Sequence, residues 1–451
     1  MTKKLWQDTP NINKLVELYT SGEDVLWDQD LVRFDIYGSL AHANMLARQK
    51  LIGKKDFENI RKGLLEILDH YQKDKYLLKP GDEDVHTRIE NDLTQKFPES
   101  GAKLHTGRSR NDQILVDTRL YTKVQLINVA LNVLELAEIF LKQAKKLSDI
   151  PLPGMTHMQP AMLSSFGLWL GAFTESLLDD LLILEFAYSL NDQSPLGSGA
   201  AYGVTLPIDR KYTAKLLGFA RVQNNALYCQ NSRGKIEVTV IHALSQVMAT
   251  LNKFASDSLL FTTEPFSFIT FKKCLGTGSS IMPQKQNWDA LELIRAKYYQ
   301  TIAFGLGSST SVGNLPSGYN RDMQQIKGNL MKAVETTLSS IKITGLFIYS
   351  ITVNEQQIQK HIPKELFAAH WAYMLVQEKS LPFRKAYIYV KKHLNQIPDF
   401  NVASLLKQAI SQGSTGNLQL TDALQRIREE KRRWKQRKKT FGKVINLLIQ
   451  K

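Results

Sequence analysis

The sequence contains little cysteine, and it lacks both a long apolar run and an apolar leader. Two cysteines, Cys229 and Cys274, stand among 451 residues, which excludes a disulfide scaffold and a zinc site of four cysteines. No uninterrupted run of about 18 apolar residues occurs, so we expect no membrane-spanning helix. Residues Met1 to Asn13 include two lysines without an apolar segment behind them, which argues against a secretory signal. We therefore expect a cytoplasmic protein.

Negative charge is scarce relative to positive charge. The chain has 58 Lys and Arg against 43 Asp and Glu, a formal net charge of +15. Nine basic residues lie within the 14 residues from Arg426 to Lys439. The simplest interpretation of this run is a solvated helix face; contact with a partner or a lipid surface stays open. No RNA-binding or zinc-finger signature accompanies it, so nucleic acid is not expected as a partner.

Proline and glycine are absent from the longest segment, residues 109–150. Within it, apolar residues recur at the spacing of one helix face. They are Leu120, Val124, Ile127, Leu131, Leu134 and Leu141. Further long helical segments are predicted over 163–190, 235–263, 288–306 and 322–352. No series of short alternating strands occurs, which indicates an all-α fold with a central bundle of long helices.

Glycine, proline and serine gather between these segments and suggest where the chain divides. A smaller helical region precedes Ser109, and shorter helices punctuated by prolines follow Thr352. We predict an N-terminal helical domain over 1–108, a central long-helix domain over 109–355 and a C-terminal helical domain over 356–451.

The segment His105–Gln113 places two arginines, two hydroxyls and two side-chain amides at the start of the longest helix. Ser109 or Asn111 can cap that helix. Arginines beside a helix N-terminus favour a carboxylate site, because forked hydrogen bonds and the helix dipole both attract an anion. A capped helix with surface arginines is the alternative.

Two loops carry candidate proton-transfer groups. His157 lies between Thr156 and a glutamine, in a loop bounded by glycine and proline; it could act as an acid or base, or be structural. The loop 276–287 contains Ser279 and Lys285 among glycines and could close over an anion. It is neither a phosphate-binding P-loop nor a Gly-x-Ser-x-Gly elbow.

The fourth segment, Tyr319–Lys327, places Gln324 and Lys327 on one helix face, although an ordinary helix start would look the same. Together, the four segments indicate an acid/base site for a polyanionic substrate. The acidic stretch Asp82–His86 could bind a cation, but pairing with basic neighbours is the expected arrangement. No His, Asp or Glu spacing suggests a metal, and we expect no cofactor.

These motifs resemble a known family. Residues 278–287 resemble the signature loop of the fumarase/aspartase superfamily, homotetrameric α-helical lyases that release fumarate. Within that superfamily, residues 105–113 resemble argininosuccinate lyases, as do residues 82–86, 291–295 and 315–319. The resemblance covers about Asp35 to Thr352, with the motifs in the family's order. It implies a fumarase/aspartase-like fold and a homotetramer with active sites shared between subunits.

The resemblance also implies a reaction, the reversible cleavage of argininosuccinate to arginine and fumarate in the last step of arginine biosynthesis. Ser279 would move the proton at the carbon beside a carboxylate, and His157, assisted by Glu292, the proton on the guanidinium side. Lys285 and Asn287 would stabilise the doubly charged carboxylate of the carbanion. The substrate-binding residues implied are Ser109, Arg110, Asn111, Thr156, Asn287, Tyr319, Gln324 and Lys327.

The chain departs from the family pattern at particular positions. Trp288 replaces the usual proline, which affects the rigidity of the loop more than its chemistry. The N-terminal motif is altered over residues 6–10, and ungapped counting places Asp24 where a substrate-binding serine is usual. An aspartate suits a guanidinium or amine better than a carboxylate.

Two alternatives remain at this point. One is another fumarate-releasing lyase, such as adenylosuccinate lyase. The other is a non-catalytic relative comparable to the lens crystallins. The intact Ser279, His157, Lys285 and Glu292 argue against the non-catalytic interpretation.

Overall fold

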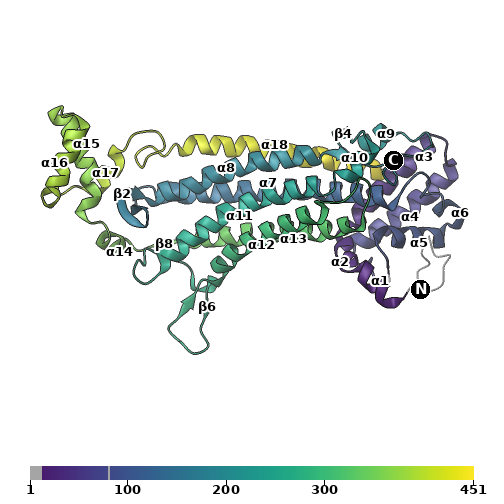
Figure 1. The fold of residues 1–451 in the computed structure, drawn as a ribbon, viewed down its shortest axis with the longest axis horizontal. Coiled ribbons are helices and arrows are strands. Elements are labelled where there is room, and N and C mark those ends of the chain that lie inside the picture. The colour runs from purple at the N-terminus through teal and green to yellow at the C-terminus, as the bar shows by residue number, and fades with distance from the viewer. Residues whose placement is uncertain (1–12, 80–81, 451) are drawn as a thin grey trace.

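The computed structural model describes residues 13–79 and 82–450. Long helices lie side by side and form the elongated centre of the molecule (Figure 1). They are α7 (Arg110–Lys146), α8 (Phe166–Asn191), α11 (Lys235–Thr262), α12 (Asp289–Val312) and α13 (Gln325–Ser350). The predicted all-α fold with a central bundle of long helices is confirmed. The altered N-terminal motif, residues 6–10, lies outside the described residues.

The central helix α7 begins where the sequence supplies a cap. The Ser109 hydroxyl accepts a hydrogen bond from the amide of Asn111 (3.2 Å), and the Ser109 amide donates to the Asp112 carboxylate (2.9 Å). By length and composition α7 could cross a membrane, but 56% of its most apolar window is buried inside the protein. Phe140 of α7 packs against Phe173 and Phe254, which joins α7 to α8 and α11.

Smaller helices cluster at the two ends of the bundle (Figure 1). The N-terminal end contains α1 (Lys14–Ser21), α2 (Asp24–Asp28), α3 (Val32–Arg48), α4 (Lys54–Gln72), α5 (Val85–Lys96), α6 (Pro98–Gly101), α9 (Arg210–Leu216) and α10 (Ala226–Asn231). The opposite end contains α14 (Glu355–Lys360), α15 (Ala368–Lys379), α16 (Phe383–Lys392) and α17 (Val402–Gln408).

The last helix, α18 (Leu420–Gln450), does not pack with α15–α17 but returns along the bundle beside α7 and α8 (Figure 1). Trp434 is fully buried and meets the Tyr188 ring of α8 edge-on at 5.5 Å. The C-terminal domain predicted over 356–451 groups α18 with α14–α17, whereas α18 packs on α7 and α8. The apolar stripe of α18 indicates that one face of this helix is buried, but the stripe does not specify which part of the protein covers that face. The division into three domains, 1–108, 109–355 and 356–451, stays a prediction.

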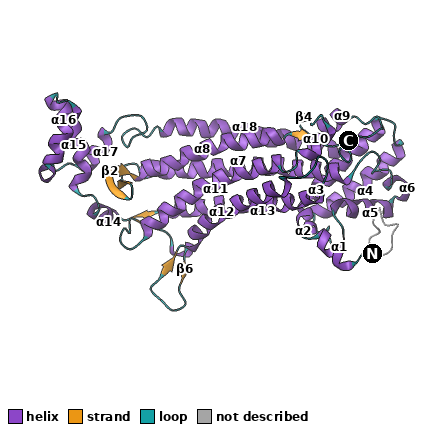
Figure 2. Cartoon of the chain, viewed as in Figure 1, coloured by secondary structure: helices purple, strands orange, loops and turns teal. Residues whose placement is uncertain are grey.

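Strands occur only as short two-stranded ribbons within the described residues (Figure 2). The longest ribbon pairs β1 (Pro151–Thr156) with β2 (Gln159–Ser165). The others pair β3 (Gln193–Ser194) with β4 (Arg221–Val222), β5 (Ile269–Thr270) with β8 (Thr352–Val353), and β6 (Thr277–Gly278) with β7 (Gln286–Asn287). The first and last of these ribbons hold predicted catalytic residues away from the bundle core.

Candidate active site

A cavity of about 170 Å³ lies at the N-terminal end of the bundle. It brings together residues of the predicted substrate-binding set that are far apart in the sequence. These are Arg110, Asn111, Tyr319, Gln324 and Lys327. The start of α7 supplies the first two, and the segment entering α13 supplies the others. Ser109 lies beside them as the cap of α7. Acidic residues complete the wall, namely Asp24, Asp28, Glu83 and Asp84.

Two predicted substrate-binding cations already have acidic partners. Nη1 of Arg110 lies 2.8 Å from Oε1 of Glu83, and its other terminal nitrogen pairs with Asp84. Burial opposes ionisation of Asp84, but the positive charges of His86 and Arg110 lower its pKa to about 2. The expected pairing of the acidic stretch with basic neighbours is thereby confirmed. An anionic ligand of this cavity must compete with carboxylates of the chain itself.

Lys327 is buried and lies between two carboxylates. Its Nζ is 2.9 Å from Oδ1 of Asp24 and also pairs with Asp28. Burial alone would lower the pKa of Lys327, but these carboxylates raise it above its ordinary value. Burial also raises the pKa of Asp24, against the opposing effect of Lys327. The expectation that Asp24 suits a cationic group agrees with this pairing.

Arg233 is a cavity residue that the sequence reasoning missed. Its guanidinium carbon lies 5.1 Å from the centre of the Tyr319 ring. Nη1 is buried and has no hydrogen-bond partner among the described residues. A buried cation without a bonded partner is costly, so a carboxylate ligand would satisfy it. The sequence around it, Ser232-Arg233-Gly234, resembles an ordinary turn before α11 and offers little signal.

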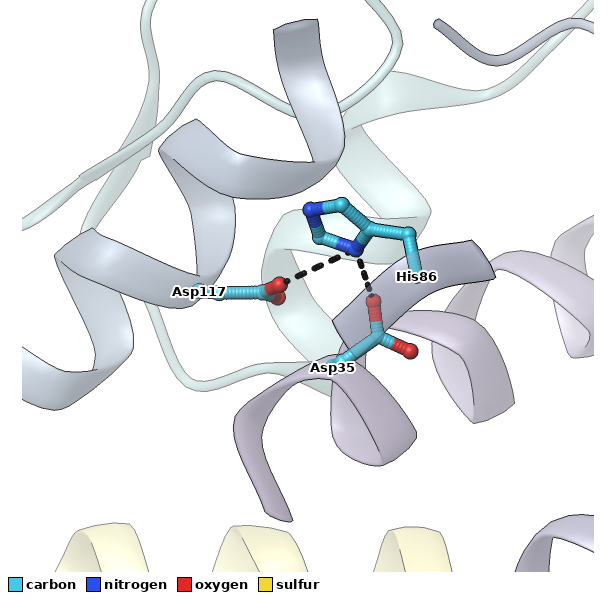
Figure 3. A group of neighbouring side chains, drawn as sticks. All are labelled: Asp35, His86 and Asp117. Carbon is cyan, nitrogen blue, oxygen red and sulfur yellow. Dashed lines mark hydrogen bonds and ion pairs between the residues drawn. The ribbon is translucent and has the colours of Figure 1, made fainter. Parts of the chain in front are cut away.

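Asp35, His86 and Asp117 form a buried ionic cluster (Figure 3). His86 of α5 donates from Nδ1 to Asp35 of α3, and the same nitrogen lies 3.6 Å from Oδ2 of Asp117 on α7. Burial lowers the pKa of His86, but Asp35 and then Asp84 raise it above the ordinary value overall. Burial and the Asp35 charge raise the pKa of Asp117. The cluster joins three helices at the wall of the cavity, because His86 is also one of the residues that line it.

Thr156 and His157 do not reach this cavity within one chain. Both are exposed at the tip of the β1–β2 ribbon, at the opposite end of the bundle (Figure 1). His157 and Met158 have φ angles of 52° and 61°, which form a tight two-residue turn. The 37 residues of α7 separate the ribbon from Arg110, a distance of about 54 Å at 1.5 Å per residue.

Ser279, Lys285, Asn287 and Glu292 form a third group on the β6–β7 loop and the first turn of α12. The Ser279 hydroxyl oxygen accepts hydrogen bonds from the amides of Met282 (3.1 Å) and Ile281 (3.4 Å). Lys285 and Glu292 are exposed. This loop projects from the side of the bundle (Figure 1). Within one chain, it lies apart from both the cavity and the His157 ribbon.

Trp288, which occupies the position of the family's usual proline, lies at the base of this loop and is held by aromatic packing. Trp288 is buried, and its ring meets that of Phe271 edge-on at 5.2 Å and that of Phe347 at 6.3 Å. Aromatic packing thus fixes the junction with α12 at the position where the family usually has proline.

Residues 9–302 match a family model described as Lyase. The argininosuccinate lyase of Thermotoga neapolitana is 39% identical over 399 residues, covering 88% of this chain and 100% of that protein. The argininosuccinate lyase of Phocaeicola vulgatus is 38% identical over 387 residues, covering 86% of each chain. The relative from Sorangium cellulosum, also an argininosuccinate lyase, is 36% identical over 427 residues, covering 95% of this chain and 99% of its own.

Solved structures of other lyases have a fold similar to that of this chain. A structure of EDDS lyase in complex with formate has a TM-score of 0.81 at 17% identity, covering 98% of this chain and 95% of its own. A class II fumarase from Schistosoma mansoni has a TM-score of 0.71 at 15% identity, covering 89% of this chain and 96% of its own. The fold and motifs therefore define a lyase of the fumarase/aspartase superfamily. Within that class, the chain belongs to the argininosuccinate lyase family.

Proposed function

We propose that this chain catalyses the reversible elimination of argininosuccinate to arginine and fumarate, as a cytoplasmic enzyme of arginine biosynthesis. The observation that carries the proposal is the cavity in which Arg110, Asn111, Tyr319, Gln324 and Lys327 converge. Relatives that are 36–39% identical over most of the chain are argininosuccinate lyases. This similarity does not favour the alternatives of an adenylosuccinate lyase or a crystallin-like relative.

The charges of the cavity suit this substrate. Argininosuccinate carries carboxylates together with a guanidinium and an amine, so its site needs both cations and anions. Arg233 and Lys327 offer positive charge to carboxylates. Asp24 and Asp84 offer negative charge to the guanidinium or amine. A substrate with both kinds of group can replace the internal ion pairs of the free cavity without leaving buried charges unpaired.

The proposed chemistry transfers one proton from carbon and returns one to nitrogen. Ser279 removes the proton beside a carboxylate, and the electrons delocalise into that carboxylate. Lys285 and Asn287 stabilise the added negative charge. The electrons then form the carbon–carbon double bond of fumarate as the carbon–nitrogen bond breaks, and His157 protonates the departing guanidino nitrogen. Glu292, brought to the imidazole by another chain, would hold it in one tautomer.

The Ser279 environment supports a role as base. Two backbone amides donate to its hydroxyl oxygen, from Ile281 and Met282. Hydrogen bonds of this kind strengthen when the oxygen becomes negatively charged, so they favour the deprotonated hydroxyl. Lys285, six residues further along the same loop, adds a positive charge near the expected position of the substrate.

We propose further that the enzyme is a homotetramer with shared sites. Proton transfer requires the cavity, the His157 ribbon and the Ser279 loop to lie within hydrogen-bond reach. Because one chain holds these groups apart, three chains would supply one group each. Exposed apolar side chains along the bundle offer a surface for this assembly. They include Leu182 (61% exposed), Phe186 (62%), Leu293 (57%), Tyr299 (65%), Leu306 (63%) and Leu346 (51%).

One assay tests the reaction. The purified protein is mixed with argininosuccinate and, separately, with adenylosuccinate, and fumarate is followed by its ultraviolet absorbance. We expect fumarate from argininosuccinate alone. Fumarate from adenylosuccinate would support the other lyase, and fumarate from neither would support a non-catalytic relative.

A further inference from the structure

Nine of the ten basic residues of α18 divide into two sets with different surroundings, and Lys438 belongs to neither set. One set turns toward the bundle and forms ion pairs with acidic residues of α7 and α8. The pairs are Arg426–Glu175 (2.6 Å), Lys431–Glu138 (2.9 Å), Arg433–Glu185 (2.8 Å) and Arg437–Glu185. This set therefore attaches α18 to the bundle, as Trp434 does through apolar packing. Only the remaining basic residues form a solvated face.

The second set faces away from the bundle. Its members are Arg428, Arg432, Lys435, Lys439 and Lys443, and we call them the outer basic stripe. They recur at intervals of four, three, four and four residues, which places them on one helix face. All five are exposed. No hydrogen bond or ion pair involves their side chains within the part of the chain that the structure describes.

Among the described residues, no acidic side chain forms an ion pair with the stripe. Glu430 turns toward another face, where it pairs with Arg433 at 3.1 Å. Glu429 lies three residues before Arg432 but accepts its hydrogen bond from Gln425, at 3.0 Å. Five like charges thus follow each other along about 22 Å of helix. Like charges at this spacing repel one another, so a ligand with a matching line of negative charge would be stabilising.

The composition of the stripe narrows the choice of ligand. Leu447 is the one exposed large apolar residue on α18, a helix described throughout, and it lies beyond the stripe. The surface therefore lacks an apolar face for insertion into a lipid layer. It also lacks aromatic side chains on which unpaired bases could stack. Lysine and arginine alone are typical of contacts to phosphate groups.

We propose that the outer basic stripe binds the phosphate backbone of double-stranded nucleic acid without reading the base sequence. A long helix holds its charges in a fixed line, and duplex DNA is a stiff polyanion with a persistence length of about 150 base pairs. Two rigid partners lose little conformational entropy on contact, whereas a flexible acidic peptide would have to be ordered. The proposal stands apart from lyase activity, since the stripe does not line the cavity or carry a predicted catalytic residue.

The test compares two variants with the same net charge. A fluorescently labelled 20-base-pair duplex is titrated with protein at salt concentrations from 50 to 200 mM, and anisotropy gives Kd. For wild type, five phosphate contacts predict a slope of log K against log salt of about −4.5. In Arg428→Gln/Arg432→Gln/Lys435→Gln/Lys439→Gln we expect the slope to approach −1, with affinity at 50 mM reduced more than tenfold.

The control variant is Lys55→Gln/Lys62→Gln/Lys75→Gln/Lys211→Gln, which removes four exposed positive charges elsewhere. We expect its affinity to stay within threefold of wild type. Equal losses in both variants would show that the general positive field binds DNA, and would overturn the proposal. Equally tight binding of labelled polyglutamate would also overturn it, in favour of an acidic protein segment.

Folding and catalysis are checked in parallel. Circular dichroism and lyase rate should match wild type in both variants. If the fourfold stripe variant misfolds, Arg432→Gln alone decides the matter, because loss of one phosphate contact should make the slope less negative by about 0.9. An unchanged slope in that single variant would remove Arg432 from the contact and refute the stripe as the binding surface.

Discussion

Arg233 and Tyr319 meet on the wall of the cavity, with the guanidinium carbon 5.1 Å from the ring centre and Nη1 left without a hydrogen-bond partner among the described residues. This pairing predicts that Arg233 binds a substrate carboxylate. Arg233→Gln should lower kcat/KM about 10- to 100-fold, since a hydrogen bond to a charged group contributes about 1.5–3 kcal/mol. Arg221→Gln, at an exposed position, is the matched control and should stay within threefold. Unchanged kinetics in Arg233→Gln would exclude this contact.

Ser279 is predicted to be the base. Ser279→Ala should lower kcat by about 10²–10⁴, the range typical of acid–base groups, with folding intact. The adjacent Ser280 is exposed and accepts no hydrogen bond from the residues that the structure describes, so Ser280→Ala should remain near wild type. Steady-state rates of fumarate formation measure both. A Ser279→Ala enzyme within threefold of wild type would remove Ser279 from proton transfer.

Subunit sharing is tested by mixing inactive variants. His157→Asn and Ser279→Ala each damage a different segment of the proposed shared site. Co-refolded together, they should regain part of the wild-type activity, because some sites then receive both intact segments. Light scattering should give the mass of four chains. A fully active single chain would contradict the shared site.

Lys285 and Glu292 are expected to act at different stages. Lys285 is predicted to stabilise charge that exists only in the transition state, so Lys285→Met should reduce kcat far more than it raises KM. Glu292→Gln should lower kcat through its effect on His157, and this loss should vanish in a His157→Asn background. Equal losses in both backgrounds would favour an ordinary helix-surface role for Glu292. No ion pair with Arg295 supports that role in the described chain.

The buried His86 cluster predicts a pH dependence of stability. The pKa of His86 is higher in the folded protein than its ordinary value of 6.5. Protonated His86 therefore adds to the free energy of unfolding at pH values below about 6.5. This stabilisation is lost as the pH rises through the higher pKa of the folded protein. His86→Gln should therefore destabilise by about 3–5 kcal/mol at pH 6, and by less at pH 9. The pKa of Asp117 is also raised in the folded protein, so Asp117 likewise lowers stability as the pH rises. The His86→Gln variant should therefore keep part of the pH dependence of stability.

Urea unfolding followed by circular dichroism at both pH values measures the difference. His70→Gln removes an exposed histidine on α4 and serves as the control. A constant gap between wild type and His86→Gln across pH would show that His86 contributes by packing alone.

The sequence by itself determined the features that depend on neighbouring residues. The cap at Ser109, the length of α7 and the helical spacing of its apolar residues all follow from local hydrogen bonds and periodicity. Arg110, Asn111, Tyr319, Gln324 and Lys327 of the cavity could be named in advance because they lie in local motifs. The five segments 82–86, 105–113, 278–287, 291–295 and 315–319 were sufficient to indicate the family before any fold was known.

Tertiary structure alone decided which distant surfaces meet. The apolar stripe that includes Trp434 indicates that one face of α18 is buried. Only the tertiary structure shows that α7 and α8 cover this face. Arg233 looks like any turn arginine until the fold encloses it beside Tyr319. The basic run of α18 likewise appears uniform, and its division into paired and unpaired sets depends on Glu138, Glu175 and Glu185. The reason is physical: periodicity records that a face is covered, whereas the partner is chosen by long-range packing and charge pairing.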